Sequence, residues 1–174
     1  MTTLLTSRHT VRDGRPVPVW ANRAAHLVSI VVLPSGLWRL GIAAGFSMGL
    51  ADADNAGLPG WQSLAIASLT IVAELTALLT LGLVKPWGER VPRWMPLIGG
   101  RWIPPGPVVA VAATGALALQ VIWAYAFRDP ELSGLTFTST GWELLFMAAY
   151  YPLLLWAPLV AAVTVAYYRR RCRD

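Results

Sequence analysis

The chain has 174 residues and a net charge of +5, with 56% hydrophobic but only 13% charged residues. Ordinary soluble domains carry about 25% charged residues, so this composition excludes a typical water-soluble globule. The charged residues and prolines lie between long apolar runs, which indicates that a lipid bilayer surrounds the runs. No basic face with interleaved aromatic residues lies outside these runs, so the positive charge does not indicate nucleic-acid binding.

Four apolar segments are predicted to cross the membrane as helices. In chain order, the expected parts are a basic arm at 1–22, spans at 24–50, 63–84, 107–127 and 142–168, and a basic tail at 169–174. Each span exceeds the ~20 residues that a helix needs to cross ~30 Å of hydrocarbon. Four strands cannot close a barrel, and open sheet edges are not tolerated in lipid. The predicted fold is therefore all-α, a polytopic membrane protein built as an antiparallel four-helix transmembrane bundle.

The basic residues predict the orientation of this bundle. Twelve of the 14 Lys and Arg residues fall in three groups of four: before residue 24, between residues 85 and 105, and after residue 168. The other two loops hold one basic residue, Arg128, against four acidic residues. The positive-inside rule places both termini and the 85–105 loop in the cytoplasm, with the protein in the cell membrane. A signal peptide cleaved near Ala51 is the alternative for the first span, but that span is too long and contains Arg39.

Two ionisable side chains lie inside the predicted spans at equal depth. Arg39 and Glu74 are each expected about 15 Å below the outer membrane boundary, at ~1.5 Å per residue. A charge inside the membrane costs roughly 2.5–3.5 kcal/mol on insertion scales, so a buried Arg39–Glu74 ion pair is the economical hypothesis. Ser35 and Gly36 share the face of Arg39, and such small residues allow two helices to approach closely.

Further polar and aromatic residues are predicted to converge on this pair. Gln120 lies on an alanine-rich stripe of the third span, and Glu143 begins a face of the fourth span that continues through Tyr150. Two interpretations stay open, a ligand pocket in the outer half of the bundle or a set of structural hydrogen bonds that determines the helix register. The pocket candidates are Arg39, Glu74, Gln120, Glu143, Trp38, Trp123 and Tyr150.

Three glycines in the first span recur at four-residue spacing. Gly41, Gly45 and Gly49 are expected to form one helical stripe where another backbone approaches closely. On a straight helix Gly41 lies about 160° from Arg39. The stripe is therefore predicted to be a homodimer seam or, alternatively, a packing surface for another helix of the bundle.

The loop between the second and third spans combines arginine with tryptophan twice. Arg93 precedes Trp94, and Arg101 precedes Trp102, each pair being followed by proline two residues later. Tryptophan beside arginine suits the headgroup layer, with the ring buried and the cation outward. The pattern predicts a membrane-surface loop that either docks a partner or anionic lipid, or anchors and caps two helices.

Three segments carry a resemblance to known proteins. These are the runs Pro86–Trp94 and Gly99–Arg101 and the ending Val163–Arg171. Together with the four-span plan, they resemble small uncharacterised integral membrane proteins of actinobacteria. The resemblance covers about a third of the chain. It implies a bacterial plasma membrane and no particular activity.

Three functional hypotheses stay open. The first is a non-enzymatic binding, scaffold or accessory subunit, partnered by the lipid bilayer and by a second copy or another membrane protein. The second is a membrane-embedded enzyme acting on a lipid or isoprenoid, with Glu74 or Glu143 as the acid. The third is a subunit of a transporter or channel. No motif implies a metal or a cofactor, and the single cysteine, Cys172, excludes an intramolecular disulfide.

Overall fold

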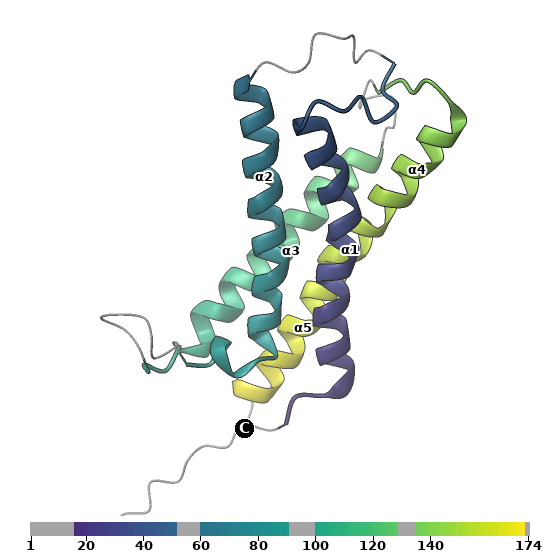
Figure 1. Cartoon of the computed structure of the whole chain (residues 1–174). Helices are drawn as coiled ribbons and strands as arrows, with labels where there is room; N and C mark the ends of the chain where they lie inside the picture. The colour runs from purple at the N-terminus through teal and green to yellow at the C-terminus, as the bar shows by residue number, and fades with distance from the viewer. Residues whose placement is uncertain (1–15, 52–59, 91–99, 129–134, 173–174) are drawn as a thin grey trace, which may run out of the picture.

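The computed structural model describes residues 16–51, 60–90, 100–128 and 135–172. Within these ranges the chain is all-helical, with isolated β-bridges but no strand (Figure 1). Four helical segments in these ranges are long and apolar enough to cross a membrane: Val19–Ala43, Gly60–Leu83, Pro105–Arg128 and Thr140–Arg171. The predicted all-α class and the presence of four membrane-length helices are thus confirmed.

Helix α1 (Val19–Ala43) ends in a Schellman motif, in which two backbone N–H groups close the last turn. The N–H of Gly45 donates to the carbonyl of Ile42 at 3.0 Å, and the N–H of Phe46 donates to the carbonyl of Gly41 at 3.0 Å. The motif requires a left-handed residue after the helix, and Gly45 supplies it with φ 91°. This turn explains why the helix stops at Ala43.

The end of α1 overturns the predicted glycine stripe. Gly45 and Gly49 lie beyond the helix with φ 91° and 75°, so only Gly41 is helical, and the side chain of Met48 covers it. The prediction assumed one helix as far as Leu50, whereas the Schellman turn interrupts the four-residue period. The three glycines therefore form no common seam on a helix face.

Gly49 instead joins two connecting segments at this end of the molecule. The backbone N–H of Thr138 donates to its carbonyl at 2.9 Å, and Leu50 forms an antiparallel bridge with Phe137. The ring of Trp142 packs directly on Gly49, where a β-carbon would overlap it. The chain after α1 is thereby tied to the start of the fourth long helix.

Two segments interrupt α-helical geometry within the other apolar runs. Helix α2 (Gly60–Leu79) tightens into the 3₁₀ segment η1 (Thr80–Leu83), which the short η2 (Pro86–Gly88) follows. In the fourth run, the 3₁₀ segment η4 (Tyr151–Leu155) separates α4 (Thr140–Tyr150) from α5 (Trp156–Arg171). Pro152 lies in η4. Proline lacks a backbone N–H and clashes with the preceding turn, which accounts for the change of geometry there.

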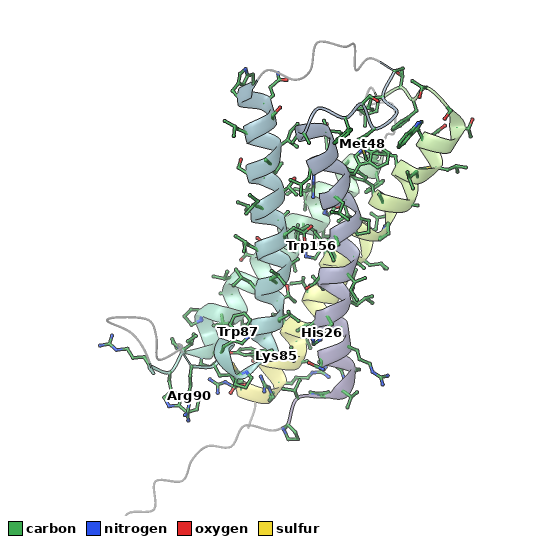
Figure 2. The ribbon with its side chains drawn as sticks, in the orientation of Figure 1. His26, Met48, Lys85, Trp87, Arg90 and Trp156 are labelled. Carbon is green, nitrogen blue, oxygen red and sulfur yellow. The ribbon has the colours of Figure 1, made fainter. Side chains whose placement is uncertain are left out.

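Helices α1 and α5 form the centre of the bundle. Helix α1 packs against α2, α4 and α5, and α5 also packs along α3 (Pro105–Arg128). Two buried clusters of apolar side chains fill these contacts, one around Tyr167 where α1 begins and α5 ends, the other around Trp156 at mid-height (Figure 2). Helix α3 is peripheral, because Ala116 is its one buried residue.

The turn between η1 and η2 depends on close backbone approach. A β-carbon on Gly88 would overlap the carbonyl of Gly82, and the ring of Trp87 packs on Gly82. This turn brings Glu89 and Arg90 back towards the end of α5, where they make the contacts described below.

We expect Gly88→Ala to destabilise the detergent-solubilised protein by about 1–3 kcal/mol, because the added methyl group meets rigid backbone. Gly106→Ala is the matched control, since no atom lies within 4 Å of a β-carbon there. Thermal or denaturant unfolding of both variants measures the difference. Equal stability of the two variants would contradict the close approach at Gly88.

Candidate functional site

Glu74 meets α1 at a glycine inside the apolar part of the bundle. Its carboxylate lies against Gly36, where a β-carbon would overlap Oε1 and would lie 3.5 Å from Cγ2 of Thr70. Gly36 and Thr70 are both buried. The absence of a side chain at Gly36 thus creates the space that the Glu74 carboxylate occupies.

Arg39 lies one turn further along α1, beside the same contact. Its terminal Nη2 donates to Oγ of Ser35 at 3.5 Å, and Oγ of Ser35 donates to the carbonyl of Val32 at 2.8 Å. The positive charge of Arg39 acts on both Glu74 and Tyr150. Residues of α1, α2 and α4 therefore contribute to one polar cluster, which we define as Ser35, Arg39, Glu74 and Tyr150.

The predicted direct ion pair between Arg39 and Glu74 is not formed. Among the described groups, neither Nε of Arg39 nor Oε1 of Glu74 has a hydrogen-bond partner, although both atoms are buried. The carboxylate packs against Gly36 while the guanidinium turns towards Ser35, so the two charges interact through space without a contact. Their free hydrogen-bonding capacity makes this cluster the best candidate in the bundle for binding a small polar group.

Aromatic rings surround one side of the polar cluster. Trp38 is buried and packs edge-on against Trp142 and Phe146, with ring centroids 6.0 and 5.6 Å apart. Phe146 in turn stacks on Tyr150 at 4.3 Å. These contacts join the C-terminal part of α1 to α4, and they bring together two predicted pocket residues, Trp38 and Tyr150.

Three other predicted pocket residues lie elsewhere. Trp123 packs against the cluster around Trp156, with its ring 5.9 Å from that of Phe127. Glu143 is exposed in the first turn of α4. Gln120 is exposed on α3 and lines a groove between α3 and α5. The predicted convergence of Gln120 and Glu143 with Arg39 and Glu74 is therefore not observed.

The groove that Gln120 lines has a volume of about 570 Å³ and a mostly apolar surface. Small side chains shape its floor and walls: Ala113, Ala116, Ala157 and Ala161. The amide of Gln120 has no hydrogen-bond partner in the part of the chain that the structure describes. The sequence predicted the alanine-rich stripe around Gln120, but it did not reveal that this stripe lines a groove with α5.

A second charged site lies at the opposite end of the bundle, where α5 ends. Glu89 accepts an ion pair from Arg170 at 2.7 Å and another from Arg171 at 3.5 Å. Arg170 also donates to the carbonyl of Leu83 at 3.2 Å, and its guanidinium lies 5.6 Å from the ring centre of Tyr167. These contacts connect the turn after α2 to the last turn of α5.

Trp102 completes this basic end. The guanidinium of Arg90 lies 4.1 Å from its ring centre and that of Arg171 lies 5.4 Å away. Arg101 is exposed beside it, while Arg93 and Trp94, the other predicted surface pair, lie outside the described residues. Figure 2 places Arg90 and Lys85 at this end and Met48 at the other.

Glu89 joins the turn after α2 to the end of α5 through two ion pairs, a role that the sequence analysis did not predict. Its two arginine partners lie in the tail, and no local pattern links them to a carboxylate in the preceding loop. One signal was available: within the three basic segments flanking the spans, Glu89 is a rare acidic residue among many cations. An isolated acid in such surroundings attracts basic partners.

Comparison of this chain with protein-family models, with curated proteins and with solved structures finds no match. The residues and their geometry must therefore support any functional proposal by themselves.

We expect Arg39→Gln and Glu74→Gln each to lower the unfolding free energy in micelles by about 1–3 kcal/mol, because each leaves the opposite charge uncompensated in an apolar setting. The double variant should lose clearly less than the sum of the two, since it leaves neither charge behind.

Unfolding titrations of the four proteins test this coupling. Glu143→Gln is the control, because this exposed carboxylate should change stability by no more than about 0.5 kcal/mol. Strictly additive losses would show that Arg39 and Glu74 do not interact.

Proposed function

We propose that the chain is a four-span protein of a bacterial plasma membrane, with antiparallel neighbouring helices and both termini in the cytoplasm. Charge asymmetry supports this topology. Among the described residues, the end where α5 finishes carries one carboxylate, Glu89, against seven cations, which are Arg23, Lys85, Arg90, Arg101, Arg169, Arg170 and Arg171. The described part of the opposite end carries only Arg128 and Glu143. Such an imbalance is typical of a cytoplasmic face.

Within that membrane the protein acts as a non-enzymatic scaffold or accessory subunit, and it assembles with a second copy of itself through α3. The observation that carries this proposal is the free amide of Gln120 in the α3–α5 groove. At ~1.5 Å per residue it lies about 12 Å from the end of α3 at Arg128, within the apolar part of the helix. Lipid tails offer an amide no hydrogen bond, so a protein partner is favoured there.

A second copy satisfies this amide better than a lipid does. The glutamine side chain both donates and accepts, so two copies related by a two-fold axis complete each other's hydrogen bonds. Small side chains at Ala113, Ala116 and Ala161 leave room for a second helix to approach the groove. The same face of one chain thus supplies both the polar contact and the close packing.

The arrangement of the acids favours a scaffold over an enzyme. Glu74 is packed against Gly36, and Glu143, the other carboxylate in the described helices, is exposed at the start of α4. A general acid must reach the atom of the substrate that it protonates. The Glu74 carboxylate instead packs against Gly36, so the polar cluster fits a binding or structural role better.

Cys172 offers a direct test of the topology, because it is the chain's single cysteine and is exposed. In intact spheroplasts, a membrane-impermeant maleimide should leave Cys172 unlabelled until the membrane is permeabilised. Ser139→Cys in a Cys172→Ser background should be labelled without permeabilisation, since Ser139 lies at the opposite end. Labelling of Cys172 in intact spheroplasts would overturn the cytoplasmic C-terminus.

Assembly through α3 is tested by cysteine cross-linking in native membranes. Leu117→Cys in the Cys172→Ser background should form a disulfide-linked dimer, because Leu117 lines the groove. Ile122→Cys, also exposed on α3, lies about 200° from Gln120 around the helix and should not cross-link.

The contribution of the amide itself is measured with Gln120→Leu, which keeps the side-chain size. We expect the dimer dissociation constant in lipid nanodiscs to rise about threefold to tenfold, the usual range for an interhelical hydrogen bond. Equal cross-linking at positions 117 and 122, or a monomeric wild-type protein, would contradict assembly through this groove. A complex with a different membrane protein at the groove would replace the second copy as its occupant.

A further inference from the structure

Two arginines share the ring of one tryptophan at the basic end. Arg90 and Arg171 lie 4.1 and 5.4 Å from the ring centre of Trp102. Each cation is attracted to the electron-rich face of the ring. The ring carries no net charge, however, so the two guanidinium groups still repel each other.

The protein supplies too little negative charge to balance them. Glu89 already accepts ion pairs from Arg170 and Arg171, at 2.7 and 3.5 Å. Arg90 is exposed and has no carboxylate partner in the described part of the chain. Two arginines therefore share the one carboxylate and Arg90 has none, so an anion beside Trp102 would relieve the remaining repulsion.

Backbone pairing and one side-chain hydrogen bond bring these three residues together. Arg90 and Trp102 form an antiparallel bridge, and the N–H of Ile103 donates to the carbonyl of Glu89 at 3.1 Å. Nη2 of Arg171 donates to the carbonyl of Ile103 at 3.5 Å. A site organised in this way loses little conformational entropy on binding, which favours affinity.

The site lies at the level where lipid headgroups are expected. Trp102 stands three residues before α3 begins at Pro105, and Arg171 is the last residue of α5. A guanidinium group recognises phosphate through two parallel hydrogen bonds, and tryptophan prefers the membrane interface. We propose that Arg90, Trp102 and Arg171 bind the phosphate group of an anionic phospholipid.

This inference rests on the proposed membrane topology but not on assembly through α3. The two are separable, because labelling of Cys172 reports the topology without involving lipid binding. An anionic lipid bound at this end would link the turn after α2, the start of α3 and the end of α5, the three segments that contribute its ligands.

The test uses the full-length protein in phosphatidylcholine nanodiscs, titrated with fluorescent phosphatidylglycerol. Arg90→Gln should weaken phosphatidylglycerol binding about tenfold, the usual loss for a hydrogen bond to a charged group. Arg169→Gln removes the same charge from the same end but touches neither Trp102 nor Glu89, so it should weaken binding less than about twofold. Arg90→Lys keeps the charge without the planar fork and should fall between wild type and Arg90→Gln.

Trp102→Leu provides a second variant, and it should also weaken binding. The thermal unfolding temperature of each variant shows whether it is folded; Arg90→Gln should match wild type because Arg90 is exposed. Equal losses in Arg90→Gln and Arg169→Gln would reduce the effect to general electrostatic attraction and overturn the site. Displacement of the lipid by an equal concentration of inorganic phosphate would show a free-phosphate site instead.

Discussion

Hydrocarbon offers no hydrogen bonds, and this constraint explains where the polar groups of the four apolar helices go. Most hydroxyl groups within the helices bond to their own backbone. Thr70 donates to the carbonyl of Ile66 at 2.8 Å, and Thr164 donates to that of Val160 at 2.7 Å. Such side chains enter the apolar region without needing a partner from another helix. The exceptions are therefore informative.

Several polar groups in the helices are exceptions, among them Arg39, Glu74 and Gln120. The first two lie on neighbouring helices, where the charge of Arg39 acts on Glu74 although the two side chains do not touch. Gly36 makes this arrangement possible, because its missing side chain admits the carboxylate beside the α1 backbone. Gln120 has no such neighbour and lies in an open groove. Arg39 and Glu74 thus each lie near an opposite charge within the chain, whereas Gln120 has no polar partner among the described residues.

At the basic end the constraint is charge balance, because cations are abundant there and acids are scarce. Glu89 receives two arginines and thereby ties the turn after α2 to the end of α5. Backbone pairing of Arg90 with Trp102 brings the start of α3 to the same place. Basic residues from which the sequence analysis predicts the membrane topology thus also make structural contacts, and an anionic headgroup at the proposed site would neutralise their excess over Glu89.

The sequence by itself determined the all-helical class, the four membrane-length apolar runs, the charge asymmetry of their ends and the presence of Arg39 and Glu74 within them. These are properties of composition along the chain, which hydropathy and loop charge report directly.

Only the tertiary structure decided which residues meet. Gln120 was predicted to join Glu74, but the rotation of α3 turns it to a separate groove, and no local pattern encodes that rotation. Helix α1 ends at Ala43 because Gly45 adopts the left-handed conformation of a Schellman motif. The glycine that the spacing assigned to a helical stripe therefore terminates the helix instead. The ion pairs of Glu89 connect segments far apart in the chain, so they arise only when the helices pack and bring their ends together.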